Sequence, residues 1–228
     1  MLGPLELTGR TRAHVVEIAE PRCTLHAAVV EPLLALRGAA LADGIDLLPV
    51  SSFRDFARQC TIWNEKFRGE RPLLDRDGEP MEAAGLTPAE RVEAILWWSA
   101  LPGASRHHWG TDFDVIDAAA LPPDVRPQLV PAEFAPGGPF ARLDAWLEAN
   151  MRRYGFFRPY VRERGGVSPE PWHLSYAPLA EPALAALDAA TLRAALEQAP
   201  IEGRDIVLAR IAPLHARYVA AIDRPRTV

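Results

Sequence analysis

Apolar residues recur at helical spacing over residues 25–41, and Asp43-Gly44 follows as a helix stop. Residues 45–50 form a short apolar run, which is typical of a buried strand. Residues 55–67 return to a helical pattern that ends at a glycine. The first part of the chain therefore predicts a helix, a strand and a second helix in succession.

The rest of the chain continues to mix the two patterns. Thr87-Pro88-Ala89-Glu90 is a capping box with proline at the first helical position, so we expect a helix from there to about residue 99. Residues 111–116 alternate polar and apolar side chains, as a half-buried strand does. Residues 140–154 are amphipathic and predict a helix. We expect further strands at 156–161 and 172–176, and irregular segments at 70–86 and 118–139.

This order of elements is that of an α+β protein. We expect a small, mostly antiparallel sheet flanked by helices, with an Ala- and Leu-rich helical C-terminal extension from Pro182 onward. A length of 228 residues suits one domain, 1–228.

Composition and charge narrow the classes of function. Hydrophobic residues make up 49% and charged residues 24%, the mix of an ordinary globular protein. The net charge is −5 and no basic stripe is present, which argues against a nucleic-acid partner. The densest basic cluster fits either a solvated face or a site for an anionic substrate. Its members are Arg152, Arg153, Arg158, Arg162 and Arg164.

The expected location follows from segments that the sequence lacks. No stretch approaches the length of a membrane span, and the N-terminus has neither the basic start nor the apolar run of a signal peptide. Two cysteines, Cys23 and Cys60, fit a reduced protein. We therefore expect a cytoplasmic protein; a removed leader, export by another route and a single disulfide stay open, as does the oligomeric state.

Two short segments far apart in the chain hold the parts of a catalytic zinc site. The first is Ser105-Arg106-His107-His108-Trp109-Gly110-Thr111-Asp112-Phe113-Asp114, and the second is Glu170-Pro171-Trp172-His173. Three protein ligands would leave one coordination position for water, and a free carboxylate would accept that water's proton. Polar surface residues beside a turn would give the same pattern.

Spacing alone does not choose among the donors of the first segment. In a strand, successive side chains point to opposite faces, so His107 and His108 are not expected to reach one metal together. Asp112 and Asp114 share a face, and either fits. One histidine and one aspartate form a natural ligand pair here, but both choices stay open.

The second segment and an upstream arginine complete the set. With His173 as a ligand, Glu170 is close enough to contact a metal-bound water, and Trp172 is placed to wall the site. Arg54 ends a predicted strand, where it could stabilise an oxyanion. The alternatives are an exposed glutamate before an edge strand, a hydrogen-bonded histidine and an ordinary salt-bridged arginine.

Taken together, these segments resemble the zinc D-alanyl-D-alanine carboxypeptidases of the peptidase M15 group, near the VanY and LdcB type. The family motif S-x-H-x-x-G-x-A-x-D corresponds to residues 105–114, and E-P-W-H corresponds to residues 170–173. The upstream S-G-Y-R motif, with Gln five residues after Arg, corresponds to Ser51-Ser52-Phe53-Arg54 and Gln59.

The resemblance assigns roles that spacing leaves open. It implies Zn²⁺ held by His107, Asp114 and His173, with Glu170 as the base and Arg54 as the oxyanion donor. It implies further that the substrate is bound by Gln59, Ser105, Ser51 and Trp172. It covers about residues 45–178, and within this range about residues 70–100 are expected to be a helical insertion. A helical tail is expected to follow at about 180–228.

The implied activity is hydrolysis of the terminal D-Ala bond of a peptidoglycan stem peptide or muropeptide. The alternatives are a peptidoglycan endopeptidase or D,D-dipeptidase, of the L-alanyl-D-glutamate type, and a non-catalytic zinc-binding module. Glu170 and Arg54 argue against the last, because a structural zinc needs neither. Asp112 departs from the family, which usually has Ala there; it is expected to raise the pKa of Glu170 or to compete as a ligand.

Overall fold

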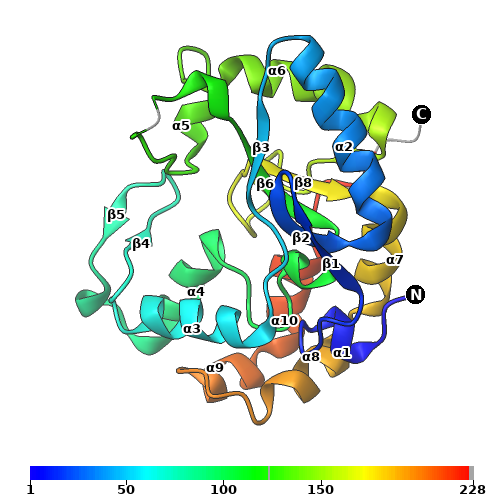
Figure 1. Cartoon of the computed structure of the whole chain (residues 1–228). Helices are drawn as coiled ribbons and strands as arrows, with labels where there is room; N and C mark the ends of the chain where they lie inside the picture. Colours follow the sequence, from blue (N-terminus) through cyan, green and yellow to red (C-terminus); the bar gives the residue numbers. More distant parts are fainter. Residues whose placement is uncertain (123, 226–228) are drawn as a thin grey trace.

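The computed structural model describes residues 1–122 and 124–225, and it confirms the α+β fold class. A four-stranded antiparallel sheet, in the order β3-β6-β8-β7, lies between two groups of helices (Figure 1). Separate two-stranded ribbons are formed by β1-β2 and β4-β5. The strands are β1 Val15–Ala19, β2 Arg22–His26, β3 Leu47–Ser51, β4 Leu73–Leu74, β5 Pro80–Met81, β6 Asp112–Asp117, β7 Phe156–Phe157 and β8 His173–Tyr176.

The predicted helices are present, and their caps explain where they begin. The Asp55 carboxylate accepts a hydrogen bond from the backbone N–H of Arg58 at the start of α3, and Thr87 and Glu90 form the predicted capping box of α4. The α-helices are α1 Pro4–Leu7, α2 Ala27–Ala42, α3 Phe56–Phe67, α4 Pro88–Trp98, α5 Pro131–Phe134, α6 Ala141–Asn150, α7 Ala177–Ala186, α8 Ala189–Leu196, α9 Arg204–Ala209 and α10 Ile211–His215. The 3-10 turns are η1 Ala83–Gly85, η2 Arg106–Trp109, η3 Ala118–Ala120 and η4 Met151–Tyr154, and a π-helical turn, η5 Ala216–Ala220, follows α10.

The structure departs from the predicted strands in three places. The β1-β2 hairpin precedes α2 and was not predicted; residues 25 and 26, which were expected to begin that helix, belong to β2. The strand expected at 156–161 is only two residues long, and a loop follows it. The irregular segment 70–86 contains the short β4-β5 ribbon.

Buried apolar side chains form two clusters, one against each face of the sheet. The sheet core includes Phe113, Val115 and Leu174 of the central strands together with apolar residues of α2 and α6. The helical core joins α3 and α4 with the tail helices α7 to α10. The tail helices and α4 therefore build the second core together with α3, and Figure 1 shows α3, α4 and α8 to α10 below the sheet.

Strand alternation aims the polar residues of β6 away from the sheet core. Phe113 and Val115 pack with α2 and α6, so Asp112 and Asp114 point to the other face. The antiparallel register places Asp114 opposite His173 of β8 and opposite Ser51 of β3. The sheet thus brings the three segments singled out in the sequence to one place.

Within the described residues, no helix combines the length and the apolar character needed to cross a membrane.

Candidate metal centre

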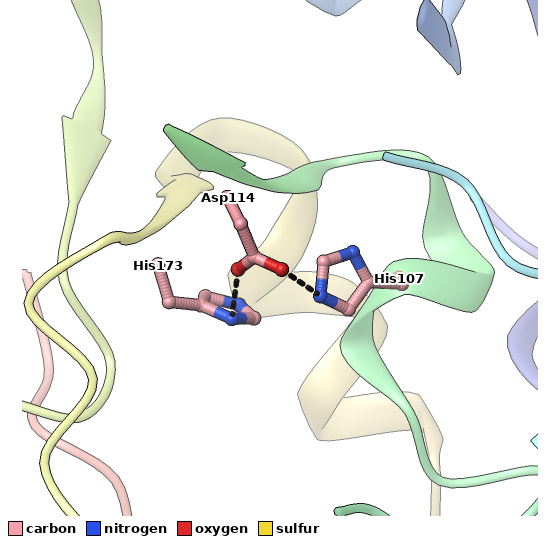
Figure 2. A group of neighbouring side chains, drawn as sticks. All are labelled: His107, Asp114 and His173. Carbon is pink, nitrogen blue, oxygen red and sulfur yellow. Dashed lines mark ion pairs between the residues drawn. The ribbon is translucent and has the colours of Figure 1, made fainter. Parts of the chain in front are cut away.

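Asp114 lies at the centre of a group of three buried side chains, with His107 on η2 and His173 on β8 (Figure 2). One donor atom from each residue lies within 4.8 Å of the others. Asp114 Oδ2 is 3.5 Å from His107 Nε2, and Asp114 Oδ1 is 3.3 Å from His173 Nδ1. Two imidazoles and one carboxylate that converge in this way match a zinc site with one coordination position left for water.

The far nitrogen of each imidazole is also held. Nδ1 of His107 is 3.0 Å from the carbonyl oxygen of Ser52, and Nε2 of His173 is 3.0 Å from Oδ1 of Asp112. Such outer hydrogen bonds fix the ring orientation and leave the inner nitrogens, Nε2 of His107 and Nδ1 of His173, as the ligand atoms. Asp114 Oδ1 is buried without a hydrogen-bond partner in the described part of the chain, as a metal ligand would be.

His108 points away from this group, so the structure brings only His107 of the two neighbouring histidines into it. Strand alternation is not the reason, since both histidines lie in the 3-10 turn η2. Nδ1 of His108 donates to the carbonyl oxygen of Arg54 at 2.5 Å, and its Nε2 accepts the N–H of Gly103 at 3.1 Å. Gly110 ends η2 with φ 68°, and a Cβ there would lie 2.6 Å from the backbone nitrogen of His26.

The hydrogen-bond partners of Asp112 could not be predicted from the sequence. Its fully buried carboxylate accepts hydrogen bonds from Arg106 Nε at 2.7 Å, Thr111 Oγ1 at 2.5 Å and His173 Nε2 at 3.0 Å. Burial alone would raise the pKa of Asp112, but these partners, Arg106 foremost, hold it below its usual range. Asp112 therefore supports the outer side of His173 and lies outside the group of three.

Proton affinity differs between the two imidazoles. Burial lowers the pKa of His107 to about 3, so this ring is neutral and ready to bind a metal. Burial acts the same way on His173, but the neighbouring carboxylates of Asp112, Asp114 and Glu170 outweigh it and raise its pKa well above the usual value. A proton and a metal ion therefore compete for His173 Nδ1.

Glu170 stands beside the group without belonging to it. Its Oε2 lies 3.2 Å from His173 Nδ1, and its side chain is 13% exposed toward a cavity. Burial raises the pKa of Glu170. A carboxylate that is buried, free of the ligand set and raised in pKa is suited to accept and return a proton.

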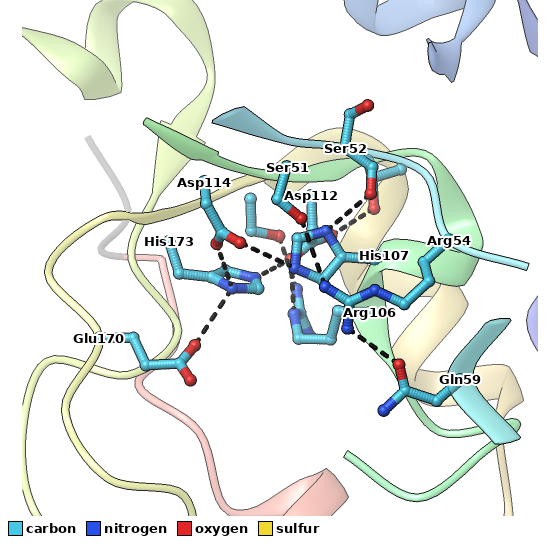
Figure 3. A network of polar contacts seen from close by, with 12 residues as sticks. Ser51, Ser52, Arg54, Gln59, Arg106, His107, Asp112, Asp114, Glu170 and His173 are labelled. Atoms are coloured by element: carbon cyan, nitrogen blue, oxygen red, sulfur yellow. Dashed lines mark hydrogen bonds and ion pairs between the residues drawn. The ribbon is translucent and has the colours of Figure 1, made fainter. Parts of the chain in front are cut away.

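Arg54 lies on the other side of the group from Glu170 (Figure 3). Its Nη1 donates to Gln59 Oε1 at 2.9 Å and its Nη2 donates to Ser51 Oγ at 3.3 Å. The amide nitrogen of Gln59 donates in turn to the carbonyl oxygen of Ala100 at 2.7 Å. Both side chains therefore hold the guanidinium group in place.

A cavity of about 240 Å³ opens onto these groups. Of the sequence-predicted site residues, it is lined by Arg54, Ser105, His107, Asp114, Glu170, Trp172 and His173. Gln59 and Ser51 stand behind Arg54 instead, and their role as substrate contacts stays a prediction. Trp172 stacks on Trp98 with 6.4 Å between ring centroids and forms one wall, as expected.

Lys66 and Tyr160 also line the cavity, and sequence reasoning missed both. Lys66 follows Gln59 by seven residues, so the helical period places the two on one face of α3, a signal that was available. Burial lowers the pKa of Lys66 to about 8. No sequence pattern pointed to Tyr160, which belongs to the loop after β7.

Comparison with known proteins agrees with this geometry. The sequence pattern of the family described as "VanY: D-alanyl-D-alanine carboxypeptidase" matches residues 22–179. An uncharacterized protein of Haemophilus influenzae is 41% identical over 103 residues, which cover 44% of this chain and 70% of that protein.

Two solved structures share the fold. VanYB in complex with D-alanine-D-alanine superposes with a TM-score of 0.52 at 26% identity, covering 74% of this chain and 79% of that one. A mutant of the D,D-pentapeptidase VanY from a VanB-type resistance cassette, in complex with Zn(II), gives a TM-score of 0.50 at 25% identity, covering 71% and 77%. The chain therefore belongs to the VanY D-alanyl-D-alanine carboxypeptidase family, as a metallopeptidase whose candidate zinc site is His107, Asp114 and His173.

Proposed function

We propose that the protein is a zinc-dependent carboxypeptidase that removes the terminal D-Ala from peptidoglycan stem peptides or muropeptides. The observation that carries this proposal is the position of Glu170, 3.2 Å from His173 Nδ1 and facing the cavity without being a ligand. A site that only held a metal would need no such free carboxylate.

Zinc is the metal that the donor set fits best. The ion would be held in a buried site by two imidazole nitrogens and one carboxylate, from His107 Nε2, His173 Nδ1 and Asp114. Zinc readily binds this combination of nitrogen and oxygen ligands. When bound, zinc would lower the pKa of a water molecule to about 7 and polarise the scissile carbonyl.

Glu170 acts as the general base. Its carboxylate accepts a proton from the attacking water and returns it to the leaving amine when the peptide bond breaks. Burial, which raises the pKa of Glu170, brings it nearer to working pH, where one carboxylate can serve both steps.

Arg54 stabilises the oxyanion that develops on the scissile carbonyl. Gln59 and Ser51 hold two of its nitrogens before substrate arrives, so little reorganisation is needed during the reaction. Removing one such donor costs about 3 kcal/mol of transition-state stabilisation in enzymes that use an oxyanion hole.

Cationic groups in the cavity favour carboxypeptidase over endopeptidase action. Arg54, Lys66 and Ser105 line the cavity together with the carboxylates of Asp114 and Glu170. A free terminal carboxylate would find positive charge and a hydroxyl donor there. A substrate whose chain continues past the scissile bond would leave these charges without a partner.

A peptide panel tests the proposal. Stem peptides that end in D-Ala-D-Ala, D-Ala or L-Ala, each with a free or amidated C-terminus, are incubated with zinc or with a chelator, and products are identified by mass spectrometry. Loss of one D-Ala from free-carboxylate peptides, only with zinc, supports it. Cleavage inside the peptide would indicate the endopeptidase alternative, and no cleavage with zinc bound would indicate a binding module.

A further inference from the structure

The end of the helical tail returns to the wall of the catalytic cavity. Asp223 is 7% exposed, and its Oδ2 accepts the backbone N–H groups of Val161 at 3.0 Å and Arg162 at 3.2 Å. The N–H of Asp223 donates to the carbonyl oxygen of Pro159 at 2.8 Å. Main-chain groups on both sides of Tyr160 are thus bonded to one residue of the tail.

Two arginines strengthen this attachment. Nη2 of Arg162 and Nη2 of Arg164 donate to Oδ1 of Asp223 at 2.8 Å and 2.7 Å. Burial would raise the pKa of Asp223, but the bonds from Arg164 and Arg162 lower it to about 2, so the carboxylate is ionised at neutral pH. These members of the basic cluster are therefore paired within the protein, which disfavours a site for an anionic substrate there.

The attached loop, residues 159–164, is hydrogen-bonded to the backbone of the general base through Tyr160. Tyr160 lines the cavity, and its ring centroid is 5.3 Å from that of His173. The carbonyl oxygen of Tyr160 accepts the backbone N–H of Glu170 at 2.9 Å. The backbone that carries Glu170 is thus bonded to a residue whose neighbours on both sides are fixed by Asp223.

We propose that Asp223 is a positioning residue: by holding the 159–164 loop, it fixes Tyr160 and the backbone of Glu170 relative to the metal ligands. This role rests on the proposed function, since it assigns the tail to the placement of the base. The three metal ligands lie on η2, β6 and β8 and not on the attached loop, so we expect the attachment to act mainly on the base.

The test compares Asp223→Ala and Asp223→Asn with the zinc-loaded wild type. Hydrogen exchange followed by mass spectrometry reports the amides of Val161, Arg162 and Glu170 whether or not any peptide is cleaved. We expect faster exchange over 159–170, a kcat lowered by about tenfold because the base is misplaced, and a zinc Kd within about twofold of wild type. The double variant Arg162→Gln with Arg164→Gln changes only exposed side chains, so it tests the same attachment should Asp223→Ala fold poorly.

Asp188→Ala is the matched control. Asp188 caps α8 of the same tail through the N–H of Thr191 at 2.7 Å, away from the loop, so its loss weakens the tail and leaves kcat and loop exchange unchanged. Unchanged exchange over 159–170 in the Asp223 variants would overturn the inference, as would a kcat equal to that of the control. If wild type cleaves no peptide, the proposed function fails, and the exchange measurement still decides whether Asp223 holds the loop.

Discussion

Oδ1 of Asp112 accepts two hydrogen bonds, one from Nε2 of His173 at 3.0 Å and one from Nε of Arg106 at 2.7 Å. One buried carboxylate therefore joins an arginine to a metal ligand. The bond directs the proton of the imidazole outward and turns Nδ1 toward Asp114. Asp112 thus supplies a second carboxylate, which acts on the metal site through His173. It stands where the family motif has alanine.

Asp112→Asn is expected to weaken zinc binding by about 10- to 100-fold, because the outer partner of His173 loses its charge. Competition with a chromophoric chelator measures the Kd. Asp117→Asn is the control, since Asp117 ends the same strand and, among the residues that the structure describes, accepts hydrogen bonds only from the backbone N–H groups of Asp46 and Ala119. Equal zinc affinities for the two variants would contradict the role given to Asp112.

Glu170→Gln is expected to keep one zinc per chain and to lose turnover by about 100- to 10,000-fold, because the amide accepts no proton. Zinc content and kcat are measured on the same preparation. A variant that has lost its zinc would make Glu170 a ligand instead of the base.

Arg54→Met is expected to lower kcat by about 100-fold or more with zinc retained, because the oxyanion loses a charged donor. Arg58→Met, one turn along on the exposed side of α3, is the control and should keep full activity. Similar rates for both variants would remove Arg54 from the mechanism.

Lys66→Met is expected to raise KM for peptides with a free terminal carboxylate, with kcat changed less. The corresponding C-terminal amides should show no dependence on Lys66, because they carry no charge for it to bind. Lys66→Arg should restore much of the affinity. An equal increase in KM for peptide acids and peptide amides would mean that Lys66 maintains the shape of the cavity and does not recognise the terminal carboxylate.

The pH dependence of stability reports on His108, which is not a ligand. Burial lowers its folded-state pKa from 6.5 to about 4, so between these values the unfolded chain binds a proton that the folded chain excludes. The contribution of His108 to stability is therefore present above pH 6.5 and lost as pH falls toward 4. Urea unfolding of wild type and His108→Gln across this range should show the smaller pH slope for the variant; parallel curves would contradict a neutral buried imidazole.

The sequence predicted those parts of the fold whose signals are local. The capping box of α4 and the alternation of β6 depend on neighbours a few residues away. The β1-β2 hairpin was missed because β1 shows no clear alternation, with the apolar Val16 exposed, and the buried residues of β2, Cys23 and Leu25, continue into the apolar pattern of α2. Strand pairing is decided by contacts distant in sequence, which one sequence does not display.

The site divides in the same way. Resemblance to a family supplied His107, Asp114 and His173 because residue types recur at fixed spacing within each motif. The partners of Asp112 depend on how η2 packs over β6 and β8, and the attachment of Asp223 depends on where the tail ends. Asp112 departs from the family motif and Asp223 lies outside it, so the contacts of these two residues are known only from the folded chain.

We propose that His107, Asp114 and His173 form a catalytic zinc site for removal of a terminal D-Ala. The most direct test is the rate of D-Ala release from a muramyl pentapeptide by protein that is stripped of metal and then titrated with zinc. Release is expected to rise in proportion to zinc up to one ion per chain. Release that is unaffected by removing the metal, or no release at full zinc occupancy, would contradict it.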